Sequence, residues 1–245
     1  MVSGERYHRF AMLILAADTS TSYYSLAICD SERVVAELNV NAGRRHAERL
    51  IDAVDWLLKE AQLSLADMEL LAVGHGPGSF TGLRVGVSSW KGLALGAGLP
   101  LVGVSSLDAM ARSCAGQDVC LCPLLDARMA EVYGAVYECR GGERRKVRDE
   151  VVCSVEELLA GLPPETVFFG EGAEVYRDQI VATIPDARFA DAAFRFPRAW
   201  GVALEARDRL ADGAVNDPGQ VRPVYLRKSQ AEEARLAAAN EATTA

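Results

Sequence analysis

The most informative stretch of the chain is Gly76-Pro77-Gly78-Ser79-Phe80-Thr81-Gly82-Leu83-Arg84-Val85-Gly86-Val87. It follows an apolar run at residues 70–73, which predicts a short buried strand, and it precedes small residues and helix formers at 83–95. The chain is therefore predicted to run from strand through glycine-rich turn to helix, and Ser79 or Thr81 can cap that helix. The spacing matches neither the Walker A loop nor the Rossmann fingerprint, so the glycines alone favour a tight turn over an anion site.

Composition indicates an ordinary soluble protein of a reducing compartment. The 245 residues suffice for one large domain or two small ones, half of them are hydrophobic, and the net charge is −8. No apolar run reaches membrane-spanning length, and the polar start at residues 1–10 predicts an N-terminal extension and not a signal peptide. The six scattered cysteines and the lack of a basic stripe predict a cytoplasmic protein without a metal site, which does not hold nucleic acid strongly by itself.

Two similar series of predicted elements indicate a duplicated α/β fold with a trimmed second half. Each series begins with an antiparallel meander, and in each an apolar strand leads to an aspartate turn, at Asp18 and at Asp126. The predicted strands lie at residues 11–17, 24–29, 34–40, 70–73, 101–104, 120–125, 131–139, 144–153 and 166–169. The predicted helices lie at residues 46–63, 83–95, 107–113, 154–159, 173–182 and 197–212. The expected organisation is an extension at 1–10, a first subdomain at 11–115, a second subdomain at 116–227 and a mobile tail at 228–245.

Two of the predicted helices carry apolar residues on two sides. In the helix at 46–63, Trp56 falls nearly opposite the apolar stripe. In the helix at 83–95, small residues gather on one side, and a second stripe carries Leu83, Val87, Trp90 and Ala94. Glycines inside an exposed helix cost roughly 1 kcal/mol each against alanine, so tight packing must offset them. We expect both helices to be covered on two sides, by the sheet and by a partner.

The two aspartate turns suggest a phosphate cleft. Asp18-Thr19-Ser20-Thr21 offers hydroxyls, backbone N–H groups and a carboxylate that could hold a magnesium-bound water, although an isolated turn of this kind more often only caps a strand. The duplicated order resembles the fold shared by actin, Hsp70 and sugar kinases (the ASKHA fold), in which the second turn is glycine-rich. Here that turn is Asp126-Ala127-Arg128-Met129, and the double glycine for adenosine is interrupted as Gly170-Glu171-Gly172. The resemblance therefore implies a degenerate nucleotide site, with Asp18, Thr19 and Ser20 as a weak phosphate turn and no cofactor.

A more specific resemblance is to the TsaB (YeaZ) family. The matching segments are ILAADTST (14–21), RHAERL (45–50), GPGSFTGLRVG (76–86), KGLA (91–94), GVSSL (103–107), DARMAEVY (126–133) and PVYLR (223–227). The resemblance covers nearly the whole chain after Phe10. It implies a non-catalytic subunit of the cytoplasmic machinery that makes threonylcarbamoyladenosine in tRNA. It also implies that the chain binds the catalytic paralogue TsaD, and with it the ATPase TsaE, and that it contacts tRNA only indirectly.

No catalytic residue and no metal ligand set is predicted. In the family's paralogue TsaD a metal-binding His-x-x-x-His lies on the equivalent helix, whereas this chain has His46 followed four residues later by Leu50. One imidazole on one turn cannot chelate a metal, because a site needs several converging ligands. Histidine is too scarce for a Ser/His/Asp arrangement, which disfavours a peptidase. His46 is expected to start the helix or to contact a partner.

The leading hypothesis is a scaffold and activator, without catalytic activity alone, that docks on TsaD or pairs with a second copy when alone. Its expected interface residues are His46, Leu50, Trp56, Leu83, Val87, Trp90 and Ala94. A rival hypothesis is a free-standing ATP-dependent kinase or ATPase, which rests on Asp18, Thr19 and the duplicated fold. A metallopeptidase is the least favoured reading, and no membrane association is expected.

Overall fold

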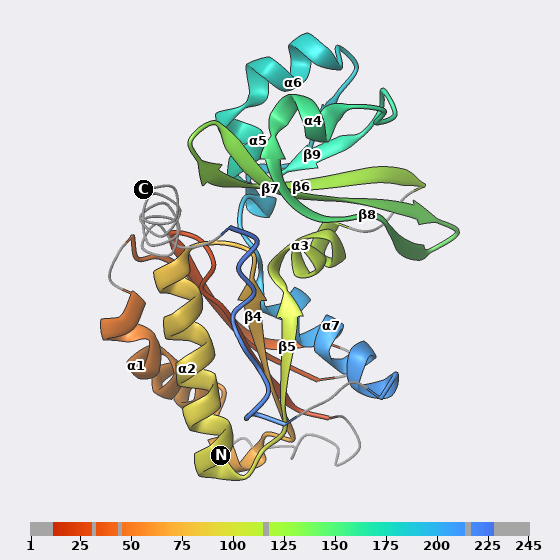
Figure 1. The fold of residues 1–245 in the computed structure, drawn as a ribbon. Helices are drawn as coiled ribbons and strands as arrows, with labels where there is room; N and C mark the ends of the chain where they lie inside the picture. Colours follow the sequence, from red (N-terminus) through yellow and green to blue (C-terminus); the bar gives the residue numbers. More distant parts are fainter. Residues whose placement is uncertain (1–11, 31–32, 44–45, 115–117, 214–216, 228–245) are drawn as a thin grey trace, which may run out of the picture.

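The computed structural model describes residues 12–30, 33–43, 46–114, 118–213 and 217–227 (Figure 1). The expected extension at 1–10, the expected tail at 228–245 and the expected boundary at 115–116 lie outside the described residues. Two β-sheets, each with its own helices, form two lobes that lie one above the other in Figure 1.

The sheet of the first lobe has five strands in the order β3-β2-β1-β4-β5. Its strands are β1 (Ile14–Asp18), β2 (Tyr23–Cys29), β3 (Val34–Asn41), β4 (Leu70–Gly76) and β5 (Leu101–Ser105). The first three form the predicted antiparallel meander, and β4 and β5 add in parallel beside β1. The central strands are apolar without alternation because helices cover both faces of the sheet.

Helices cover both faces of this sheet, and alternate residues of β1 point towards the two helix layers. The helices of the first lobe are α1 (His46–Glu60), α2 (Phe80–Ala97), α3 (Ser106–Cys114) and α7 (Ala199–Ala211), with a 3-10 turn at Leu65–Asp67. Leu15 and Ala17 of β1 pack in the cluster with α1 and α2, whereas Ile14 and Ala16 pack in the cluster with α7. Figure 1 shows α1 and α2 side by side on one face and α7 on the other.

The second lobe repeats the sheet of the first. Its strands are β6 (Val119–Arg128), β7 (Glu131–Arg140), β8 (Glu143–Ser154), β9 (Val167–Phe169) and β10 (Arg188–Phe189), in the order β10-β9-β6-β7-β8. Its helices are α4 (Val155–Leu159), α5 (Glu171–Val175) and α6 (Arg177–Thr183), with a 3-10 turn at Ala192–Phe194. Again three antiparallel strands form a meander and two short strands add in parallel. The predicted duplication is confirmed, with a smaller second half.

Two predictions about the second half are wrong. The helix predicted at 173–182 is two short helices, α5 and α6, which meet at Tyr176. The last helix, α7, was assigned to the second subdomain, yet it packs against β1, β2 and β4 of the first lobe. Its buried residues Ala199, Val202 and Ala203 complete that core, because Ala16 of β1 and Ala72 of β4 leave room for a closely packed helix. The helix predicted at 154–159 begins with a capping box, in which Ser154 and Glu157 cap each other's backbone.

Two glycines let α2 approach the first turn of the chain closely. A Cβ atom added at Gly82 would lie 2.0 Å from the Thr19 carbonyl oxygen, and one at Gly86 would lie 2.2 Å from Thr19 Oγ1. Thr19 Oγ1 also donates a 2.7 Å hydrogen bond to the Gly82 carbonyl. Further along the same helix, a Cβ atom at Gly92 or Gly96 would meet nothing within 4 Å. Among the described residues, therefore, Gly82 and Gly86 have a packing reason to be glycine, whereas Gly92 and Gly96 have none.

These two pairs predict opposite effects of the same substitution. Gly86→Ala should lower the free energy of unfolding by about 1–3 kcal/mol, because the added methyl overlaps buried Thr19. The matched control, Gly92→Ala, should raise it by up to about 1 kcal/mol, because alanine favours the helix and the added methyl has free space. Urea unfolding in dilute solution measures both, and equal effects at the two positions would contradict this account of α2.

Candidate functional site

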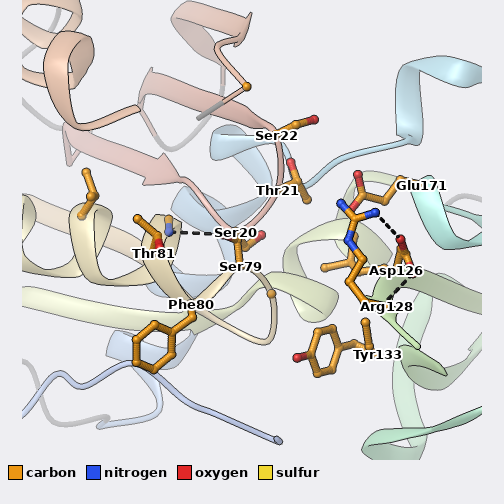
Figure 2. Close-up of a pocket in the computed structure, with 16 residues that line it drawn as sticks. Ser20, Thr21, Ser22, Ser79, Phe80, Thr81, Asp126, Arg128, Tyr133 and Glu171 are labelled. Carbon is orange, nitrogen blue, oxygen red and sulfur yellow. Dashed lines mark hydrogen bonds and ion pairs between the residues drawn. The ribbon is translucent and has the colours of Figure 1, made fainter. Parts of the chain in front are cut away.

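A cleft with a volume of about 840 Å³ lies between the two lobes (Figure 2). The first lobe contributes hydroxyl side chains to its wall, and the second lobe contributes charged ones. The hydroxyl residues are Ser20, Thr21, Ser22, Ser79 and Thr81, and the charged residues are Asp126, Arg128 and Glu171. The two predicted aspartate turns therefore do border one cleft, as the duplicated order implied.

Asp18 is buried within the first lobe, and both of its carboxylate oxygens accept hydrogen bonds from other residues of that lobe. Oδ1 accepts hydrogen bonds from the backbone N–H of Ser20 at 2.8 Å and from Ser20 Oγ at 2.6 Å. Oδ2 accepts a 2.7 Å hydrogen bond from Ser106 Oγ at the start of α3. Burial raises the pKa of Asp18, and these three hydrogen bonds oppose that shift. The carboxylate ties β1 to α3, which differs from the expected hold on a magnesium-bound water.

Thr19 and Ser20 join the first turn to the start of α2. Thr19 is fully buried against Gly82, while the Ser20 carbonyl accepts a 2.7 Å hydrogen bond from the backbone N–H of Ser79. Ser79 Oγ in turn accepts from the backbone N–H of Gly82 at 3.3 Å, which confirms Ser79 as the N-cap of α2. Of the three predicted phosphate-turn residues, only Ser20 borders the cleft.

The second turn is built from residues with side chains, and its backbone conformation is unusual. Arg128, Met129 and Ala130 have φ values of 65°, 55° and 62°, a left-handed conformation that residues other than glycine rarely adopt. Asp126 Oδ1 accepts from the backbone N–H of Arg128 at 2.9 Å, and its other oxygen pairs with the Arg128 guanidinium at 3.0 Å. Figure 2 shows this pair beside Glu171. The charges of Asp126 and Arg128 are therefore paired within the turn.

The interrupted double glycine of the second lobe serves packing. A Cβ atom added at Gly170, where φ is 99°, would lie 2.1 Å from the Leu124 carbonyl oxygen of β6. Between the two glycines Glu171 reaches the cleft wall, and burial, followed by the charge of Asp126, raises the pKa of its carboxyl. The side chain of Glu171 thus forms part of the cleft wall between the two glycines.

The charges of the cleft oppose a polyphosphate. Two carboxylates, Asp126 and Glu171, line the second wall against one guanidinium, that of Arg128, which is already paired. A phosphate that approached this wall would meet like charge in a partly enclosed space. The hydroxyl wall opposite can accept and donate hydrogen bonds to a polar group without supplying positive charge.

The described residues place no group of three or more histidine, cysteine, aspartate or glutamate side chains where they could hold a metal ion. His75 lies in a buried position, where desolvation and then the charge of Arg209 lower its pKa to about 4. His8 and the side chain of His46 lie outside what the structure describes.

The expected docking stripe of α2 lies inside the first lobe. The structure buries Leu50 of α1 and also Leu83, Val87, Trp90 and Ala94 of α2. Trp90 is fully enclosed, and its Nε1 donates a 3.3 Å hydrogen bond to the Leu15 carbonyl of β1. The expectation that this stripe faces a partner is therefore wrong, because the sheet covers it. Trp56 is different, since half of its surface (51%) is exposed on α1.

Two residues that join the end of the described chain to the rest of the molecule were not predicted to have a role. Tyr225 and Arg227 lie in the PVYLR segment near the end of the described chain, and they contact α2 and the second turn respectively. A signal was present, since an aromatic residue and an arginine follow a proline there in a region otherwise poor in apolar residues.

Two copies of one sheet unit that meet at a cleft define a protein of the actin-like ASKHA class. Component A of (R)-2-hydroxyglutaryl-CoA dehydratase from Acidaminococcus fermentans shares this fold, with a TM-score of 0.51 at 12% identity over 82% of this chain and 99% of that one. A family model described as TsaD, tRNA N6-adenosine threonylcarbamoyltransferase, matches residues 39–235.

Closer relatives define the family. The chain is 34% identical to the tRNA threonylcarbamoyladenosine biosynthesis protein TsaB of Escherichia coli K12 over 90% of this chain and 96% of that protein. It is 35% identical to TsaB of Haemophilus influenzae over 88% and 94% of the two chains. YeaZ from Pseudomonas aeruginosa superimposes with a TM-score of 0.76 at 31% identity, over 88% of this chain and all of that one. The chain belongs to the TsaB (YeaZ) family.

Within residues 12–30, 33–43, 46–114, 118–213 and 217–227, no helix is both long and apolar enough to cross a bilayer.

The buried state of Asp18 predicts a pH dependence of stability. Because its pKa is raised on folding, the stability that Asp18 contributes is fully present below the ordinary value of 3.8 and is lost as pH rises through the folded-state value. Asp18→Asn cannot ionise, so the wild type should lose stability relative to this variant as pH rises from about 4. Urea midpoints of both proteins across this range measure the difference, and a difference independent of pH would contradict it.

Proposed function

We propose that the chain is a non-catalytic subunit of the machinery that forms threonylcarbamoyladenosine in tRNA. In this role it docks on the catalytic paralogue TsaD, and with it on the ATPase TsaE, in the cytoplasm. The names of its TsaB relatives and the TsaD family model support the pathway. The proposal includes no cofactor of its own and only indirect contact with tRNA.

The docking proposal rests on apolar side chains of α1 and α2 that the described residues leave exposed. Trp56 and Ile51 of α1 and Leu95 of α2 are 51%, 47% and 66% exposed. Gly92 and Gly96 lie one turn apart on α2 with open space beside them. Exposed helical glycines weaken a helix, and they allow the backbone of a second helix to approach closely.

The paralogue fits this face because it shares the fold. Two chains built on one fold can pack through one pseudo-symmetric surface, helix pair against helix pair, and the same surface would pair two copies of this chain when the paralogue is absent. Docking there could shift the paralogue towards its active geometry if its own helix pair is held in one position. A non-catalytic role is supported by Asp18 and Thr19, whose polar atoms serve the packing of the first lobe.

Trp56→Asp should weaken binding to TsaD by about tenfold or more, because a buried aromatic supplies a large share of interface energy. The variant should keep its thermal stability, since Trp56 is half exposed in the isolated chain. Val175→Asp is the matched control, because Val175 is 62% exposed on α5 of the second lobe. Pull-down with purified TsaD measures the loss. Unchanged capture of Trp56→Asp would place the docking face elsewhere.

The same pair of variants tests the pathway. The wild type and Val175→Asp should support formation of modified adenosine when combined with TsaD, TsaE, threonylcarbamoyl-AMP synthase and tRNA. Trp56→Asp should not. Modification at full yield without this chain would contradict its role as a required subunit.

The rival hypothesis of a kinase or ATPase differs from the proposed function in whether the isolated chain binds nucleotide. The isolated chain should show no micromolar binding of ATP with magnesium in calorimetry, because the carboxylates of Asp126 and Glu171 face the cleft and Asp18 is occupied. Micromolar binding that is lost in Asp18→Ala would support the kinase reading instead.

A further inference from the structure

The last described segment, residues 217–227, runs along the first lobe beside α2 and β4 (Figure 1). Lys91 Nζ of α2 donates to the Val221 carbonyl at 3.2 Å, and the backbone N–H of Val224 donates to the His75 carbonyl of β4 at 2.7 Å. Val221 itself is buried in the core beneath α2. These contacts fix the segment on the first lobe before it reaches the cleft.

Tyr225 then anchors the segment on the first turn of α2. Its ring lies 4.7 Å from that of Phe80, centroid to centroid, and its hydroxyl accepts a 3.1 Å hydrogen bond from Arg84 Nε. The Arg84 guanidinium also lies 3.9 Å from the Phe80 ring centroid. Phe80 borders the cleft, so this three-residue stack stands at its rim.

Two residues further on, Arg227 contacts the other lobe. One of its terminal nitrogens donates to the Ala127 carbonyl at 2.9 Å, and the guanidinium forms an ion pair with Glu131. Ala127 and Glu131 flank the left-handed turn of Arg128, Met129 and Ala130. The planar guanidinium can serve both partners at once because its donors point in fixed directions.

The turn between these two partners closes the β6–β7 hairpin, in which Arg128 pairs with Glu131. Its three successive residues have positive φ, which side chains disfavour, and Met129 at its tip is 79% exposed. Within the turn, the Asp126 carboxylate bonds the backbone and guanidinium of Arg128. Arg227 adds the contact that comes from the first lobe.

We propose that residues 221–227 form a latch that ties the left-handed turn of the second lobe to α2 and thereby fixes the width of the cleft. Ala127 and Arg128 line the cleft and belong to the latched turn, so release of Arg227 frees one wall while the other stays on α2. The latch is a property of the isolated chain and does not depend on the proposed partner.

Hydrogen–deuterium exchange of the full chain tests the latch. In Arg227→Ala the amides of residues 127–131 should exchange about tenfold faster than in the wild type, because opening of the turn no longer has to break the interlobe contacts. Arg227→Lys should also exchange faster, since an ammonium cannot reproduce the fork. Arg222→Ala is the matched control, because Arg222 bonds only carbonyls of its own segment, those of Gly219 and Val221, among the described contacts.

A second variant tests the strain. Ala130→Gly removes the side chain that disfavours the left-handed backbone, so in this background Arg227→Ala should accelerate exchange less than in the wild-type background. Faster exchange confined to residues 127–131 supports the latch. Exchange like that of the wild type, or an equal acceleration throughout β7 and β8, would overturn it.

Discussion

The close contact between Thr19 and the start of α2 determines much of the rest of the structure. Because Gly82 and Gly86 bring the helix backbone onto Thr19, the first turn of the chain and the N-terminus of α2 form one rigid corner. This corner makes the hydroxyl wall of the cleft, it directs the stripe with Trp90 into the core, and it leaves the opposite side of α2 exposed. A single packing constraint thus sets both the cleft and the surface offered to other molecules.

The two halves share one arrangement of sheet and aspartate turn, and the aspartate has a different role in each half. In the first half the aspartate of the turn is enclosed and joins β1 to α3 through Ser106. In the second half the corresponding aspartate stays at the cleft and neutralises Arg128. Neither carboxylate is left as a free ligand for a cation, and the glycines of the second half fill space against β6. The actin-like fold is thus present with both aspartates bonded inside their own lobes.

Much of the fold could be predicted from the sequence, because apolar runs and the meander pattern are local signals that recur in both halves. The placement of Trp90 could not, since periodicity shows that a helix is apolar on two sides without showing whether its own chain covers both. The return of α7 to the first lobe and the reach of Arg227 to Ala127 depend on contacts between distant segments. The aspartate turns do border the cleft, yet the hydrogen bond to Asp18 Oδ2 comes from Ser106, which lies 88 residues away.

The position of α7 has a consequence for how the protein is made. The helix covers one face of a sheet whose strands all precede residue 106, although it is itself translated only after the whole second lobe. During synthesis the side chains of Ile14, Ala16, Leu70 and Ala72 therefore lack the cover that α7 provides while the second lobe emerges. The first lobe cannot reach its final state on the ribosome before residues 199–211 are available. Completion of the first lobe thus depends on a helix from the far end of the described chain, although the architecture is that of two repeats.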